Sequence, residues 1–388
     1  MKLRKIAIAA AVLCSLSSSL ACAQSSVTLY GVFDTGIEYV NRASTATSAG
    51  GLVRLQKYGG LSASRWGLRG EEDLGDGLKA TFWLESGFTP GDGKLVSASQ
   101  LFYRQAAIGL TKSGFGKVSL GRQYTSLMES MVNFLPFKTS VAYEPANTIA
   151  GAAYREDNML KYTGDFGNTH VLAHYSFGTG FAFQGGQMST IPNGEVPGNS
   201  RAQAAFGAGV YYLGESFGIA TGYDQINNAL TATSPIGEDR KAFIAASYET
   251  GPIRFMGGYR WRDSRYGNGV TAIRDNVYWA GMSYSMTAAM KLIAGYYYDQ
   301  VLGASLSPNT KAASLPNFSQ FSLMGAYSLS KRTTVYLVSA YAHNGPVDYD
   351  TLLQTGASYG YGNPTTLNGL ANGQKSQVAV AAGLRVIF

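Results

Sequence analysis

Few side chains in this sequence are suited to catalysis or to metal binding. The three histidines are His170, His174 and His343. His170 and His174 are four residues apart, a spacing that suits a shared zinc site only on a helix. On a strand the same spacing separates them by about 13 Å, so we interpret them as polar residues that face water. His343, with Asp348 and Asp350 close by in the sequence, is the only hint of a hydrolytic cluster.

The other motifs of catalysis and cofactor binding are incomplete. Gly207-Ala208-Gly209 lacks the third glycine of a dinucleotide-binding turn, and Gly373-Gln-Lys-Ser376 lacks the spacing of a phosphate-binding loop. Both cysteines, Cys14 and Cys22, lie among the first 23 residues. The sequence therefore predicts no enzyme, no cofactor and no metal site.

The first 23 residues have the features of a secretory signal peptide. Three basic residues, an apolar stretch over residues 6–13 and Ala21-Cys22-Ala23 form its positive, apolar and cleavage regions in order. A lipoprotein signal ending at Cys22 is the alternative interpretation. We expect export of residues 24–388, which lowers the net charge from +7 to +4 because three basic residues and no acidic ones are removed.

The elements that must position polar residues are strands, because apolar and polar side chains alternate along most of the chain. Within residues 27–39, for example, Val27, Leu29 and Phe33 share one face and Asp34 and Glu38 share the other. Sixteen segments have this pattern. They lie near residues 27–39, 64–74, 78–89, 101–112, 117–124, 157–165, 169–177, 203–213, 217–225, 241–250, 253–263, 276–285, 289–299, 319–328, 333–343 and 376–388.

Connections between these segments alternate between short polar turns and long loops. All turns are therefore at one end of the fold and all loops at the other, as in an up-and-down antiparallel meander. An even number of strands allows closure, and sixteen leave a lumen open to water. We predict an all-β fold over residues 24–388, a 16-stranded antiparallel transmembrane β-barrel.

Composition distinguishes this barrel from a soluble β-sandwich with the same alternation. Only 14% of the residues are charged, against about 25% in soluble domains. Tyr, Phe and Trp gather near the ends of the predicted strands, as in the aromatic girdles of membrane barrels. A charge of +4 without a basic cluster also predicts no nucleic-acid partner.

Several stretches resemble the trimeric porins of Gram-negative bacteria, the beta-proteobacterial branch especially. They are Val27-Thr-Leu-Tyr-Gly-Val-Phe-Asp34, Ser64-Arg-Trp-Gly-Leu-Arg-Gly-Glu-Glu-Asp-Leu-Gly-Asp-Gly-Leu-Lys-Ala80, Arg104-Gln-Ala-Ala-Ile-Gly-Leu110, Gly116-Lys-Val-Ser-Leu-Gly-Arg-Gln123, Leu329-Ser-Lys-Arg-Thr333 and Gly383-Leu-Arg-Val-Ile-Phe388. The resemblance implies a homotrimer in the cell outer membrane, among lipids that include lipopolysaccharide. It also implies passive diffusion of ions and small hydrophilic solutes through a channel narrowed by an inward-folded third loop, here residues 125–156.

The resemblance further implies a row of wall arginines at the constriction. Strict alternation of strand faces would turn Arg122 outward, and it would also turn Arg104 outward. Because an unpaired guanidinium in lipid costs about 2–4 kcal/mol, we expect a β-bulge or a loop junction to redirect both. The implied arginines are Arg65, Arg104, Arg122 and Arg155.

The third loop departs from the family pattern where charge matters. Leu135-Pro-Phe-Lys138 stands where the family often has Pro-Glu-Phe-Gly, so a carboxylate is missing and Lys138 is added. Glu129 and Glu144 are the acidic residues firmly within the loop. We therefore expect a weak to moderate preference for anions. A substrate-specific channel is the alternative, and an adhesin or a barrel enzyme is a more distant one.

Two further expectations concern assembly. The terminal Phe388 follows outward Leu384 and Val386, and it resembles the family's C-terminal signal for the outer-membrane assembly machinery. Small or mixed residues expected to face outward on the first strands predict that these strands form the trimer contact. They are Gly31, Thr35, Gly67 and Gly70.

Overall fold

The computed structural model describes residues 26–44, 48–139, 142–151, 153–184, 187–190, 194–229, 231–305, 307–347, 370 and 373–388. The expected signal peptide, residues 1–23, lies outside these ranges, as do Asp348 and Asp350. No helix in the described ranges is long and apolar enough to cross a membrane.

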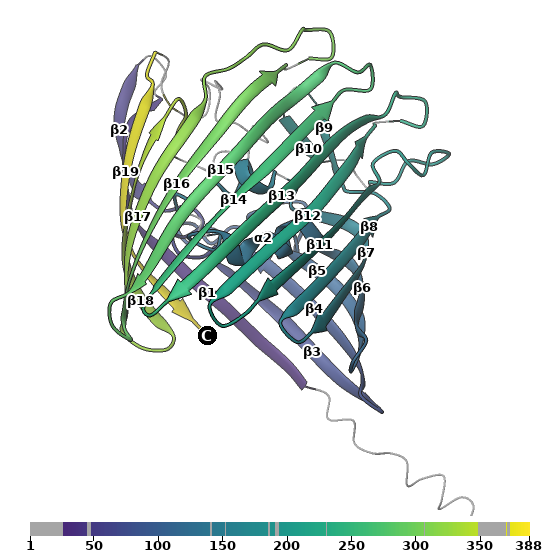
Figure 1. Ribbon diagram of the computed structural model, residues 1–388, viewed down its shortest axis with the longest axis horizontal. Coiled ribbons are helices and arrows are strands. Elements are labelled where there is room, and N and C mark those ends of the chain that lie inside the picture. The colour runs from purple at the N-terminus through teal and green to yellow at the C-terminus, as the bar shows by residue number, and fades with distance from the viewer. Residues whose placement is uncertain are drawn as a thin grey trace, which may run out of the picture.

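Sixteen antiparallel strands form one closed barrel, shown with its tilted strands in Figure 1. Closure joins the first strand to the last, with Val32 opposite Ile387 and Val40 opposite Ala379. All sixteen predicted segments are strands in the structure. The wall consists of β1 (Ser26–Ser44), β3 (Arg65–Gly75), β4 (Leu78–Gly87), β5 (Gln105–Lys112), β6 (Gly116–Tyr124), β7 (Arg155–Phe166), β8 (Thr169–Ser176), β11 (Ala205–Leu213), β12 (Phe217–Asn228), β13 (Gly237–Thr250), β14 (Ile253–Arg265), β15 (Thr271–Ser285), β16 (Met290–Ala304), β17 (Phe318–Ser328), β18 (Thr333–His343) and β19 (Ser376–Ile387).

The two faces of the wall are the reverse of those in a soluble protein. On β1, the side chains of Leu29 and Ile37 are 61% and 64% exposed, whereas Asp34 and Glu38 on the opposite face are 0% and 3% exposed. The apolar residues therefore point outward and the polar residues point inward. This arrangement suits a barrel whose outer face lies in lipid and whose inner face meets water and other polar groups.

Several regions predicted as loops contain further elements. β2 (Ala49–Leu55) pairs with the second half of β1, whose first half pairs with β3 on the same side. Without β2, that part of β1 would have unpaired backbone groups along one edge. The others are β9 (Phe181–Gln184) and β10 (Gln187–Thr190), which form a separate hairpin, and α2 (Ser126–Met131), η1 (Val132–Phe134) and α3 (Ala146–Ala150) between β6 and β7.

The glycine argument for the trimer contact is wrong in part. Gly67 lies opposite Tyr30, and a Cβ on it would lie 2.6 Å from the Tyr30 hydroxyl, so it faces the interior. Gly31 and Gly70 do face outward, but a Cβ at either would meet an aromatic ring of the same chain, that of Phe388 or Phe82. Gly31 and Gly70 thus make room for rings within one protomer.

Candidate functional site

The segment between β6 and β7, residues 125–154, packs against the inner side of the wall. It ends two residues earlier than predicted because β7 begins at Arg155. Its helix α2, visible within the barrel in Figure 1, is capped at its N-terminus by Thr125, whose Oγ1 accepts a hydrogen bond from the Met128 N–H at 3.3 Å. Apolar side chains of the segment form one buried cluster with side chains from the wall. They include Leu127, Met131, Phe134, Leu135 and Ile149 from the segment, and Phe243, Trp279 and Tyr297 from the wall.

Polar side chains on distant strands hold the backbone of this segment. Arg260 on β14 donates hydrogen bonds to the carbonyl oxygens of Thr148 and Ile149, the latter at 2.9 Å. Trp279 on β15 donates to the Phe134 carbonyl at 2.9 Å. Across the interior, the hydroxyl of Tyr143 donates to Glu38 on β1 at 2.9 Å. The bonds from Arg260 and Trp279 supply partners that an irregular buried backbone would otherwise lack, and the bond from Tyr143 ties the segment to β1 through a side chain.

Three of the predicted arginines gather near the start and end of this segment. Nε of Arg104 lies 2.6 Å from one carboxylate oxygen of Glu85, and Nε of Arg65 lies 3.2 Å from the other. The Arg155 guanidinium lies 4.2 Å from the ring centroid of Tyr124, and Arg155 donates a hydrogen bond to the Tyr124 hydroxyl. We refer to Arg65, Arg104 and Arg155 as the arginine group. Glu85 is its only carboxylate partner in an ion pair among the described residues.

The arginine group combines exposed and buried charge. The side chain of Arg65 is 26% exposed, whereas that of Arg104 is 9% exposed. The Tyr154 ring also lies beneath Arg155, at 4.9 Å. Burial raises the pKa of Tyr154, so this ring is a neutral phenol under the guanidinium. Cation–π contacts hold a guanidinium in place without cancelling its charge.

A β-bulge with its extra residue on β7 lies opposite Arg122, at the position where the alternation of strand faces predicted a bulge or a loop junction. The pairing of β6 with β7 shifts register between Gly121 and Gln123, and Gly121 has a φ of +115°. Arg122 is therefore 10% exposed and forms an ion pair of 2.6 Å with Asp157. Arg104 precedes β5 and is not part of that strand, so the loop junction turns it. Arg122 is neutralised by its partner and contributes little net charge.

The charged residues of the segment have unequal surroundings. Glu129 forms an ion pair with Lys161 of β7. Glu144 is 1% exposed and accepts hydrogen bonds from the Phe137 N–H at 2.8 Å and from the Tyr297 hydroxyl at 3.0 Å. Its carboxylate thus organises the segment itself. Lys138 is exposed, with a φ of +51°.

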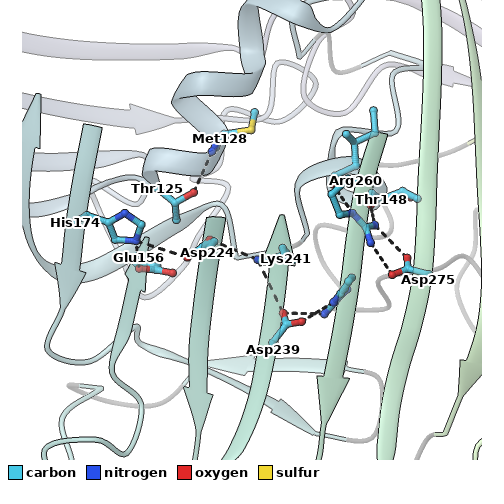
Figure 2. Close-up of polar contacts among 12 residues, drawn as sticks. Thr125, Met128, Thr148, Glu156, His174, Asp224, Asp239, Lys241, Arg260 and Asp275 are labelled. Carbon is cyan, nitrogen blue, oxygen red and sulfur yellow. Dashed lines mark hydrogen bonds and ion pairs between the residues drawn. The ribbon is translucent and has the colours of Figure 1, made fainter. Parts of the chain in front are cut away.

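A row of buried charges on the strands from β12 to β15 was not recognised as a site from the sequence. Figure 2 shows Asp224 and Lys241 side by side, Asp239 below Lys241 on the same strand, and Arg260 with Asp275 further along the wall. Arg260 and Asp275 form an ion pair of 2.6 Å, and so do Arg262 and Asp239. The only signal was the alternation of Arg254, Arg260 and Arg262 on one strand face. Opposite charges in this row cancel one another, unlike those of the arginine group.

Comparison with known proteins agrees with this architecture. The chain matches the Gram-negative porin family over residues 9–346. It is 29% identical to an outer membrane porin protein of Bordetella pertussis, over 88% of this chain and 95% of that protein. It is 30% identical to outer membrane porin protein 32 of Delftia acidovorans, over the whole of both chains.

Solved structures share the fold. An anion-selective porin from Comamonas acidovorans superimposes with a TM-score of 0.71 at 24% identity, over 94% of this chain and all of that chain. A trimer form of the Vibrio cholerae outer membrane protein OmpT gives 0.63 at 15% identity, over 94% and 99% of the two chains. With a closed wall of sixteen strands, outward apolar faces and a match along most of its length, the chain belongs to the Gram-negative porin family and is a channel of the outer membrane.

Proposed function

We propose that the protein is a passive diffusion channel for ions and small hydrophilic solutes, with a weak to moderate preference for anions. Residues 125–154 form the constriction in this proposal, because the segment is bonded to inward-facing side chains on well-separated strands. The family and the fold support a channel and not an enzyme. We infer that the chain has no catalytic activity of its own.

The charge balance of the arginine group carries the proposed anion preference. The three guanidinium groups have one carboxylate among them, that of Glu85, which pairs with Arg65 and Arg104. Arg122 and Glu129, which were also expected at the constriction, are each paired with an opposite charge. Lys138 adds an exposed positive charge. At physiological salt the Debye length is about 8 Å, so uncompensated charge on the wall of a narrow pore biases which ions pass.

The name of one structural relative also supports a preference for anions. The Comamonas acidovorans porin is described as anion-selective. The missing loop carboxylate at Leu135-Pro136-Phe137-Lys138 points the same way.

Reversal potentials in planar bilayers under a salt gradient test the proposed selectivity. We expect chloride preference in the natural protein. Arg65→Ser should lower the chloride-to-potassium permeability ratio by about twofold. One charge about 8 Å from an ion in water contributes about 0.5 kcal/mol, with opposite sign for chloride and potassium, and salt screening over one Debye length reduces this about threefold. Arg332→Ser, at an exposed turn between strands, is the matched control and should leave the ratio unchanged. Cation preference in the natural protein, or no change in Arg65→Ser, would contradict the proposal.

We further propose a homotrimer that sits among outer-membrane lipids, including lipopolysaccharide, and is inserted by the outer-membrane assembly machinery. A trimer form among the matched structures supports the oligomeric state. The exposed terminal ring of Phe388, which follows the exposed Leu384 along the same strand, supports a role as the assembly signal.

A further inference from the structure

A compact group of potential metal ligands lies on the inner side of the wall, beneath the start of α2. Glu156 belongs to β7, His174 to β8 and Asp224 to β12, and Figure 2 shows the three side chains converging. One ligand atom from each lies within 4.8 Å of the other two. We propose that Glu156, His174 and Asp224 bind a divalent transition-metal cation such as Zn²⁺. The proposal rests on this geometry and does not depend on the ion preference proposed above.

The position of Gly207 makes the convergence possible. Gly207 on β11 lies directly opposite His174 on one side and Asp224 on the other. Because neighbouring strands are about 4.8 Å apart, β8 and β12 are about twice that distance apart. A Cβ on Gly207 would lie 2.6 Å from Cε1 of His174 and 3.2 Å from Oδ1 of Asp224. The side-chain space left open by this glycine is where the two ligands meet.

The ligand atoms are buried and lack hydrogen bonds. Glu156 and Asp224 are 0% exposed and His174 is 6% exposed. Among the described residues, both oxygens of each carboxylate and Nε2 of His174 have no hydrogen-bond partner. Burying such groups without partners is costly. A cation would satisfy one oxygen of each carboxylate and the imidazole nitrogen together.

The separations suit a metal better than they suit direct hydrogen bonds. Nε2 of His174 lies 3.3 Å from Oε2 of Glu156 and 3.7 Å from Oδ1 of Asp224. Both distances exceed the usual 2.7–3.2 Å of an N–H···O hydrogen bond. Ligands at about 2.0–2.1 Å from a tetrahedral zinc ion are about 3.3 Å apart. One histidine and two carboxylates form a ligand set that zinc accepts, with a fourth position left for water.

The other side of the imidazole would change its hydrogen bond when a metal binds. Nδ1 of His174 lies 2.9 Å from Oγ of Ser126 and 3.1 Å from the Ser126 N–H. With a metal on Nε2, Nδ1 carries the proton and donates it to Ser126 Oγ, as ligating histidines do to a neighbouring oxygen. Without a metal, Nδ1 accepts from the Ser126 N–H. Metal binding therefore changes the hydrogen bond at the first residue of α2.

The nearby charges limit the affinity without preventing binding. Nζ of Lys241 lies 3.6 Å from the second oxygen of Asp224, and Asp239 is paired with Arg262. Glu156 and Asp224 then carry two negative charges against one on Lys241. Binding of a divalent cation changes the net charge of these three side chains and the ion from −1 to +1. Because the site then holds an excess positive charge, we expect micromolar and not tighter affinity for the metal. By tying β7, β8 and β12 together, the metal would fix the wall under the start of the segment 125–154.

Isothermal titration with ZnCl₂ tests the proposal on the full protein, folded in detergent and stripped with a chelator. We expect one equivalent to bind, and Glu156→Gln, His174→Gln and Asp224→Asn each to weaken binding at least tenfold. His170→Gln is the matched control, because His170 lies on the same strand and pairs with Asp165 at the turn; it should bind as the natural protein does.

A second measurement needs no variant. Co²⁺ bound by these ligands in four- or five-coordinate geometry should give visible absorption bands much stronger than those of hydrated Co²⁺, and Zn²⁺ should remove them. Stoichiometric binding that survives Glu156→Gln and Asp224→Asn would overturn the proposal. So would the absence of both Zn²⁺ binding and a Co²⁺ spectrum in the natural protein. Because the second readout uses the unaltered chain, poor folding of a variant leaves the test decisive.

Discussion

At the scale of single residues, Glu85 sets how much positive charge the arginine group shows. It is 3% exposed and pairs with both Arg65 and Arg104. Glu85→Gln should raise the chloride-to-potassium permeability ratio by about twofold, opposite in sign to Arg65→Ser. It should also lower the free energy of unfolding by about 3 kcal/mol, because two largely buried cations lose their counter-charge. Bilayer reversal potentials and urea unfolding in detergent measure the two effects.

Glu72→Gln is the control for this change, since Glu72 is an exposed carboxylate on the same hairpin. It should move neither quantity. A permeability ratio that falls in Glu85→Gln would show that the arginine group does not control selectivity.

The residues of the candidate site were only partly predictable from the sequence. Arg65, Arg104 and Arg155 do gather, but the shared partner Glu85 comes from β4, and no local pattern links it to them. Glu144 was expected as a constriction charge, yet it accepts hydrogen bonds from its own loop and from Tyr297, far away in sequence. Alternation predicts the face of a strand residue; in a loop it predicts nothing, because the orientation there depends on distant contacts.

At the scale of elements, Gly121 fixes the backbone of β6 directly before Arg122, opposite a bulge whose extra residue lies on β7. A Cβ on Gly121 would lie 2.1 Å from the Ala106 carbonyl oxygen, and the φ of +115° already excludes most side chains. Gly121→Ala should therefore force β6 away from β5 or prevent folding. We expect a loss of several kcal/mol in unfolding free energy, or a sharply reduced yield of folded barrel in detergent.

Gly114→Ala is the control that separates the clash with Ala106 from the strain of placing a side chain at positive φ. Gly114 lies in the turn of the same hairpin with a φ of +78°, and a Cβ there meets nothing within 4 Å. That variant should cost only about 1 kcal/mol, the usual effect of a side chain at positive φ. Equal effects of the two substitutions would mean that the close approach of Gly121 to Ala106 adds no cost beyond the backbone strain.

Strands were more predictable than the elements between them. A strand in this wall separates lipid from the interior, so its sequence alternates over its whole length. The short helices α2 and α3 and the strand β2 carry no such signal. α2 has five buried residues in six and is stabilised by packing on the wall, and β2 forms because it completes an edge of β1.

At the scale of the whole molecule, the last residue takes part in closure. The backbone of Phe388 exchanges two hydrogen bonds of 3.0 Å with Gly31, and its ring covers that glycine. Deleting Phe388 should leave most of the protein in the periplasm, as measured by cell fractionation. Phe388→Ala keeps the backbone bonds and should show a similar defect if the ring is the recognised signal. Normal outer-membrane levels of the deletion variant would refute this role.

The oligomeric state is also a property of the whole molecule. We expect a detergent-solubilised mass of three protomers by analytical ultracentrifugation, with contact through the first strands. Leu29 on β1 is 61% exposed in the single chain, and Leu29→Asn should weaken the trimer. Leu323→Asn on β17, outward and 46% exposed, should leave the trimer intact. A single-protomer mass for the natural protein would contradict the expectation.

The pairing of β1 with both β3 and β19 means that the wall has no first strand in any structural sense. Each strand has a neighbour on both sides, and Gly31 and Phe388 are already in contact. The ends of the chain could be joined and new ends opened at a tight turn such as Gly75–Gly77 without changing a single strand pair. The order of the strands in the chain does determine the order of folding. Every other neighbouring pair of wall strands is closer in sequence than β1 and β19. The β1–β19 pairing that closes the barrel therefore spans the largest loop and is the slowest to form.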